Sequence, residues 1–181
     1  MIIKEINVGE NNPFRFEHIP ETEEERFELA ISDLCGYLNN NRCNIFVEKD
    51  IFDKAVKHGY ISSDSILLID ADSAEVDSVL DNISMTYCDP EWWSELINKS
   101  SECERVILVI DSVSASCNEH KLRCYIRLVK DRYFNFNDVP SNLSIVITGN
   151  SYDELIYKSR TMDELLSLCM LISLKHYQLR T

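Results

Sequence analysis

Glycine is scarce in this sequence, and no glycine-rich phosphate-binding loop is present. The 181-residue chain has only four glycines, at positions 9, 36, 59 and 149, and the pattern Gly-x-x-x-x-Gly-Lys-Ser/Thr does not occur. That pattern supplies the backbone N–H groups that surround a nucleotide's phosphates. Its absence argues against nucleotide hydrolysis.

Long apolar runs and paired cysteines are also lacking. The longest apolar runs, at 66–69, 106–110 and 168–172, are far too short to cross a bilayer. The first residues do not resemble a secretory signal, so we expect a cytoplasmic protein without membrane contact. Seven cysteines without a Cys-x-x-Cys pair fit neither a zinc site nor a disulfide framework. We therefore expect no metal or other cofactor.

Basic residues are outnumbered by acidic ones. Thirty-one acids against eighteen lysines and arginines give a net charge of −13, which disfavours direct binding to nucleic acid. The surplus indicates a solvated surface or an acidic face for a basic protein partner, and an acidic mimic of nucleic acid would carry the same charge. Arg123, Arg127 and Lys130 form a basic stripe on one predicted helix face. We expect a solvated face there, with contact to nucleic acid or to a second subunit's acids as the alternative.

Strand and helix patterns alternate along the chain. Buried strands are predicted at 43–47, 65–70, 105–111 and 143–148, and amphipathic helices at 21–38, 51–58, 75–83, 90–99, 118–132 and 162–177. This order predicts one α/β domain over residues 1–181, with 1–20 as an N-terminal edge segment and 21–181 as the core. We expect three layers: a mainly parallel sheet of about five strands with helices on both faces.

Two of these strands end in polar groups, at Asp111 and Asn150. Residues 106–111 resemble the Walker B strand of AAA+ ATPases, and 139–150 resemble their sensor-1 strand. Segments 140–142 and 161–166 are similar in order to the MoxR and McrB-like branches. The resemblance implies a P-loop-NTPase-like topology with strand order 5-1-4-3-2.

Other parts of that family's chemistry are missing. Ser112 replaces the catalytic glutamate, residues 48–53 stand where the phosphate loop belongs, and Arg160 lacks the motif of an arginine finger. Glu48 and Asp50 would repel phosphate. The resemblance thus implies a degenerate AAA+-like domain, a non-catalytic binding or regulatory protein that acts by protein–protein contact. Asp111 and Asn150 are its candidate binding residues.

Two adjacent tryptophans add a candidate contact with a protein partner. Trp92 and Trp93 lie in the predicted helix 90–99, where neighbouring side chains diverge by about 100° around the axis. One ring therefore points outward or into an interface, where an exposed aromatic side chain can anchor binding.

An alternative function rests on Asp70 and Asp72. A buried strand followed by Asp-x-Asp-x-Ser resembles motif I of haloacid-dehalogenase-type phosphatases. That resemblance implies a magnesium-dependent phosphoryl hydrolase, with Asp70 as nucleophile, Asp72 as general acid or base, and both holding the metal; Thr148 and Lys158 would complete the site. The acidic pair expected after a further strand is missing. Asp72 is explained more simply as the N-cap of a helix beginning near Ala74.

Overall fold

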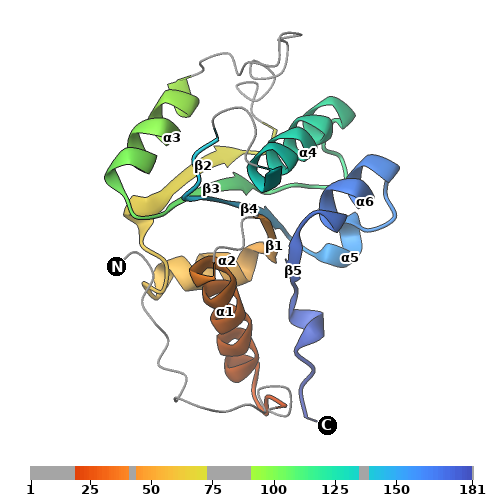
Figure 1. Ribbon diagram of the computed structural model, residues 1–181. Helices are drawn as coiled ribbons and strands as arrows, with labels where there is room; N and C mark the ends of the chain where they lie inside the picture. Colours follow the sequence, from red (N-terminus) through yellow and green to blue (C-terminus); the bar gives the residue numbers. More distant parts are fainter. Residues whose placement is uncertain (1–18, 41–43, 73–90, 135–138, 181) are drawn as a thin grey trace.

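The described part of the chain forms a five-stranded sheet flanked by helices (Figure 1). The structure is a computed structural model that describes residues 19–40, 44–72, 91–134 and 139–180. The strands are β1 (Asn44–Glu48), β2 (Ile66–Asp70), β3 (Val106–Asp111), β4 (Leu143–Gly149) and β5 (Met170–Ile172).

All neighbouring strands are parallel, and their spatial order is β2-β3-β4-β1-β5. Counted from the opposite edge this is 5-1-4-3-2, the order that the Walker B and sensor-1 resemblance implies. The predicted α/β class, with a parallel sheet between two helical layers, is confirmed.

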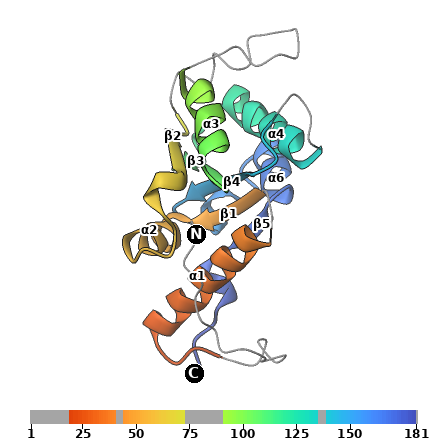
Figure 2. The same cartoon turned by 60° about the vertical axis from the view of Figure 1, so that its left-hand side comes forward.

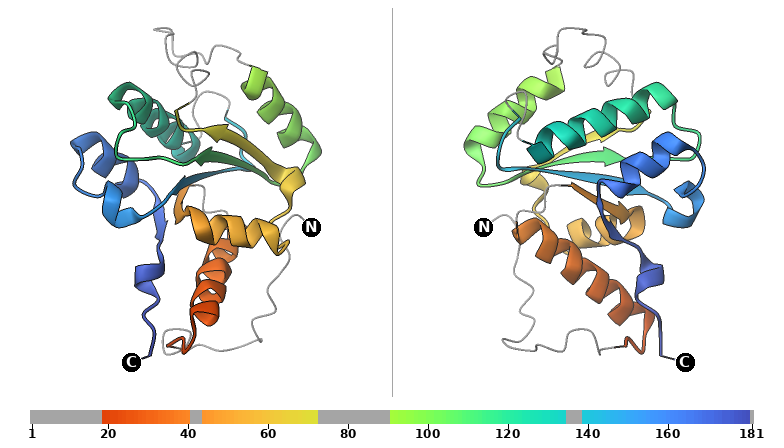
Figure 3. Two further views of the ribbon diagram at one scale, coloured as in Figure 1. Left: turned by 180° about the vertical axis from the view of Figure 1, so that it is seen from behind. Right: turned by 45° about the vertical axis from the view of Figure 1, so that its right-hand side comes forward.

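Helices cover both faces of the sheet, as two rotated views show (Figures 2 and 3). On one face lie α1 (Glu23–Asn39) and α2 (Lys49–Lys57); on the other lie α3 (Glu91–Glu102), α4 (Glu119–Phe134), the short α5 (Tyr152–Leu155) and α6 (Arg160–Ser167). Two 3-10 turns, Ser63–Ser65 and Leu174–His176, complete the described elements. Each layer has its own apolar core, because successive strand residues point to opposite faces.

Local signals in the sequence account for the ends of two helices. The Thr22 side chain caps α1 by accepting a hydrogen bond from the Glu25 N–H at 3.1 Å. Helix α2 ends at Lys57, and two residues later Gly59 has a φ of 72°, a conformation that glycine adopts without strain. The Tyr60 N–H bonds back to the Ala55 carbonyl, which completes the expected C-terminal motif.

The predicted helix 162–177 is wrong beyond Ser167. Helix α6 ends there, and β5 follows after two residues. The apolar spacing continues through Met170 and Ile172, but these residues pair with β1, and Ile172 is fully buried beside Val47. A short apolar run is compatible with either a helix or a strand. Here it forms a strand because its backbone pairs with the edge of β1.

Some expectations concern residues outside the described ranges. They include the N-terminal edge strand within 1–18, the helix 75–83 and the start of the helix predicted at 90–99. Among the described helices, none is both long enough and apolar enough to span a membrane.

Candidate functional site

The carboxyl ends of the central strands bring several polar side chains to one edge of the sheet. Asp70 and Asp111 are direct register partners on β2 and β3. Thr148 lies one residue beyond the β3–β4 pair Ile110 and Ile147. Open parallel sheets place their ligands at this edge, so it is the candidate site.

Asp111 is held by an ion pair with Lys49. The Lys49 Nζ atom lies 2.6 Å from Asp111 Oδ1, and both side chains are partly buried, with 30% of Lys49 and 17% of Asp111 exposed. Thr148 Oγ1 donates to the same carboxylate oxygen at 2.8 Å, and Ser112 Oγ donates to the other at 3.0 Å. Both oxygens of Asp111 are therefore occupied by donors from the chain itself.

These contacts keep both members of the pair charged. Burial works to raise the pKa of Asp111, but hydrogen bonds from Lys49, Thr148 and Ser112 outweigh it, and the pKa lies below its ordinary value. Burial likewise works to lower the pKa of Lys49, and the bond to Asp111 reverses the effect and raises it. Neither group is tuned for proton transfer near neutral pH.

Ser112 has a left-handed backbone, with φ of 64°. Such a conformation costs a non-glycine residue about 1 kcal/mol or more. It is held because the Ser112 N–H donates to Thr148 Oγ1 at 2.9 Å and its hydroxyl donates to Asp111. Ser112 thus serves to fix Asp111 in place.

Strand β1 passes directly into α2, so there is no loop between them. Glu48 is the last residue of β1 and the N-cap of α2, and Lys49 is the first helical residue. The Glu48 carboxylate points to the C-terminal segment, where it accepts bonds from the Ser173 hydroxyl at 2.7 Å and the Leu174 N–H at 2.8 Å. Glu48 therefore has a structural role as well as a negative charge, because it binds Ser173 and Leu174.

Asn150 lies just past this cluster. It is exposed, and the described contacts of Asp111 do not include it. Gly149 separates it from Thr148 because space is short there: a Cβ atom would come within 3.1 Å of the Val113 carbonyl oxygen. The Thr-Gly-Asn sequence is thus explained by a close approach of two backbones.

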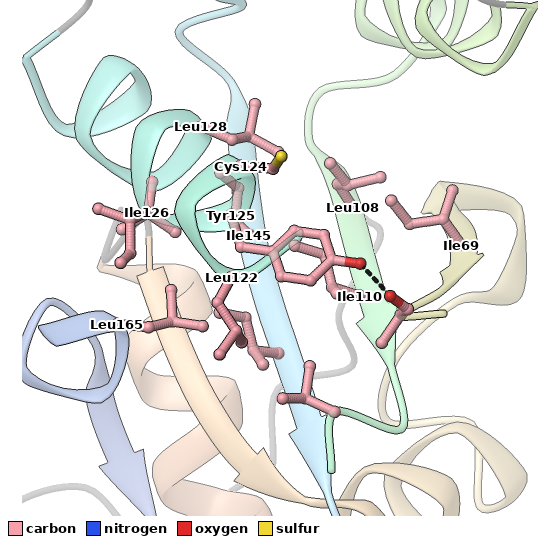
Figure 4. Close-up of a cluster of buried hydrophobic side chains, with 14 of the residues drawn as sticks. Ile69, Leu108, Ile110, Leu122, Cys124, Tyr125, Ile126, Leu128, Ile145 and Leu165 are labelled. Atoms are coloured by element: carbon pink, nitrogen blue, oxygen red, sulfur yellow. Dashed lines mark hydrogen bonds between the residues drawn. The ribbon is translucent and has the colours of Figure 1, made fainter. Parts of the chain in front are cut away.

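Asp70 and Asp72 form a turn. The Asp72 N–H donates to Asp70 Oδ1 at 2.8 Å, and both residues are exposed. From α4, the Tyr125 hydroxyl donates to the Ala71 carbonyl (Figure 4) and Lys121 donates to the Asp72 carbonyl. Within the described ranges, no three histidine, cysteine or acidic side chains form a group suited to a metal ion.

The remaining candidates belong to α3 and α4. Trp92 and Trp93 belong to α3, but their side chains are outside what the structure describes. In the basic stripe, the Arg127 Nε atom lies 3.8 Å from Asp131 Oδ2. The Lys130 Nζ atom lies 2.8 Å from Oε1 of Glu164 in α6. Arg123 is exposed.

Lys49 is the residue that sequence reasoning missed. A lysine directly after a strand, at the edge where Asp111 also ends its strand, was the available signal. This segment is instead interpreted in the sequence analysis through the acids on either side of Lys49, Glu48 and Asp50, which would repel phosphate. The hydrogen bond of Tyr125 could not be predicted from local sequence either, because its partner is a backbone carbonyl 54 residues away.

No protein-family model and no curated protein matches the chain. Among solved structures, the chain is similar to the Orc1 protein of Aeropyrum pernix in complex with DNA, with 14% sequence identity and a TM-score of 0.41. The alignment covers 86% of this chain and 47% of that chain, so this chain spans about half the length of that protein. The α/β fold class is therefore assigned from the order and the parallel pairing of the strands.

Proposed function

We propose that this protein is a non-catalytic binding or regulatory protein, a degenerate AAA+-like domain that acts through contact with another protein. The observation that carries the proposal is the ion pair of Lys49 with Asp111, 2.6 Å apart at the edge where such folds bind nucleotide.

The geometry of the β1–α2 junction supports the loss of nucleotide chemistry. A triphosphate needs a loop of several N–H groups between strand and helix, and here Glu48 and Lys49 are consecutive members of the two elements. A magnesium ion at Asp111 would have to displace the ammonium group of Lys49, and the hydroxyls of Thr148 and Ser112 already donate to the carboxylate.

The surface supports action by protein contact. Several large apolar side chains are exposed among the described residues, and aromatic ones often anchor interfaces. They include Leu68 at 56%, Tyr133 at 65%, Phe134 at 56% and Tyr157 at 84%. The net charge of −13 would favour a partner with a basic surface.

Turnover assays test the proposal against the phosphatase alternative. Phosphate release from Mg·ATP and from p-nitrophenyl phosphate is measured for the wild type, Asp70→Asn and Asp111→Asn. We expect no turnover in any of them. Metal-dependent phosphatase activity lost only in Asp70→Asn would overturn the proposal in favour of a phosphoryl hydrolase. ATP hydrolysis lost only in Asp111→Asn would overturn it in favour of an ATPase.

A further inference from the structure

Residues 170–180 form a basic segment in an otherwise acidic chain. They include Lys175, His176 and Arg180 and no acidic residue, whereas the whole chain has 31 acids. The first three residues are β5, which covers the edge of β1 that β4 leaves free. The rest of the basic segment runs beside α1 (Figure 1).

Four carboxylates from other parts of the chain bind the basic segment. Each accepts a hydrogen bond or forms an ion pair with it: Glu48 with Ser173 and Leu174, Asp33 with Tyr177, Asp153 with Lys175, and Glu21 with Arg180. The surface under the basic segment is therefore complementary in charge to a basic chain.

Other contacts on this surface recognise backbone groups. The edge of β1 pairs with residues 170–172 in parallel register. The Arg26 guanidinium donates to the Leu174 carbonyl at 2.7 and 3.0 Å, and the Pro20 carbonyl accepts from the Arg180 N–H at 2.8 Å. Any chain in the same extended conformation offers these backbone groups, so the side chains decide which chain binds. We call the edge of β1, with Glu21, Arg26, Asp33 and Glu48, the docking surface.

The basic segment buries little of itself on the docking surface. Of its eleven residues, Ile172 and Ser173 are buried and the others are partly or fully exposed. Segments with few buried apolar contacts open at a low cost in free energy. The apolar spacing of α6 also continues through Ile172, so the released segment has a helical alternative. Release leaves the edge of β1 and its acidic surroundings open to another chain.

We propose that the docking surface binds an extended basic segment of a partner protein, and that the chain's own basic segment occupies it in the partner's absence. This inference rests on the proposed function, and it names the site and the chemistry of the partner. The partner segment has an apolar residue at the place of Ile172, a hydroxyl donor toward Glu48, and basic residues after it. The two segments compete, so the docked basic segment lowers the apparent affinity for the partner.

A peptide that competes with the basic segment tests the docking surface. The probe is a fluorescent peptide of residues 170–180, and anisotropy follows its binding to the full-length protein. Ser173→Ala combined with Tyr177→Phe removes two bonds of the chain's own segment and leaves the docking surface unchanged. We expect this double variant to bind the peptide at least about tenfold more tightly than the wild type does. A control peptide carrying Lys175→Glu and Arg180→Glu should not bind.

Substitutions on the docking surface provide the reverse test. Glu48→Ala and Asp33→Ala, each added to the double variant, remove an acceptor for the peptide and should weaken its binding about tenfold. Glu95→Gln, which removes an exposed acid of α3, is the matched control and should leave binding unchanged. Circular dichroism verifies that each variant is folded.

Three results would overturn the proposal. They are no binding of the peptide to the folded double variant at millimolar concentration, equal binding of the basic peptide and the acidic control peptide, and a wild-type dimer in sedimentation velocity that the peptide dissociates, since the occupant would then be a second copy. Failure of the proposed function is distinguishable: phosphate release together with specific peptide binding would overturn the proposed function alone. Absence of both would overturn this inference alone.

Discussion

Lys49, Thr148 and Ser112 together lower the pKa of Asp111. Its pKa is lowered in the folded protein, so its contribution to stability is present above the ordinary aspartate value of 3.8 and is lost as the pH falls through the lowered value. The pKa of Lys49 is raised, so its contribution is present below 10.5 and is lost as the pH rises through the raised value. The pair therefore stabilises the fold across the whole neutral range.

Replacing Lys49 tests this electrostatic role. Lys49→Met leaves Asp111 without its ammonium partner, and we expect the free energy of unfolding at pH 7 to fall by about 1–3 kcal/mol. The matched control is Lys57→Met at an exposed position of the same helix, which should change stability by less than about 0.5 kcal/mol. Urea denaturation measures both.

The pH dependence sharpens the same prediction. The difference between wild type and Lys49→Met should be constant from about pH 5 to 9 and should shrink as Asp111 becomes protonated in acid. A difference that grows below pH 4 would contradict the assigned ion pair.

Tyr125 offers a second test at the residue scale. It is 1% exposed, and its hydroxyl donates to the Ala71 carbonyl in the turn after β2. Burial is the main reason why the pKa of this phenol is raised above its ordinary range. Tyr125→Phe leaves a buried carbonyl without its donor, so we expect a loss of about 1–3 kcal/mol in thermal or urea denaturation. Tyr133→Phe, at a 65% exposed residue, should have no measurable effect. Equal effects of the two substitutions would contradict this role.

At the scale of elements, sequence patterns predicted most of the strands and helices because their signals are local. The apolar runs of β3 and β4 are buried on both faces, and the Thr22 cap and Gly59 stop mark helix ends. The sequence does not specify β5 locally. Met170 to Ile172 become a strand by pairing with β1, which is a tertiary effect.

The end of β5 is fixed by charged side chains from two other elements. The Leu174 N–H donates to Glu48 of β1, and the Leu174 carbonyl accepts two bonds from the Arg26 guanidinium of α1, at 2.7 and 3.0 Å. Further along, the Tyr177 hydroxyl donates to Asp33 of α1 at 2.6 Å. These contacts connect positions about 125 to 150 residues apart, so no sequence window contains them.

Replacing a glycine by alanine is expected to change the stability of the protein in opposite directions at two positions. Gly59→Ala forces a side chain into the left-handed conformation at the end of α2 and should destabilise the protein by about 1 kcal/mol. Gly36→Ala places a methyl group on α1 where no atom beyond the adjacent residues and the surrounding helix backbone lies within 4 Å, and should stabilise the protein by about 0.5–1 kcal/mol. Differential scanning calorimetry measures both; shifts of the same sign would contradict these backbone assignments.

At the scale of the whole molecule, the alternation of strands and helices predicted the α/β class, and the motif resemblance implied the strand order that the sheet has. The candidate site could be predicted only in part. The end of β3 identified Asp111, but its partner comes from β1 and α2, 62 residues earlier. The two meet because β1 and β3 are both neighbours of β4, which is a property of the topology.

Within the described residues, the polar groups at this edge of the sheet bind one another. Lys49 provides the positive charge, Thr148 and Ser112 provide hydroxyl donors, and no loop separates β1 from α2. Under the proposed function, the acidic and apolar outer surfaces are where a partner protein would bind. This division between a closed sheet edge and an exposed surface is the basis of the proposed binding role.

The most direct measurement is the melting temperature of the wild type with and without millimolar Mg·ATP. A site with low-micromolar affinity would add about 3 kcal/mol of stability, equivalent to roughly 6–12 °C for a chain of this size. The closed Lys49–Asp111 edge predicts no shift for the wild type. A rise of several degrees that disappears in Asp111→Asn would contradict it.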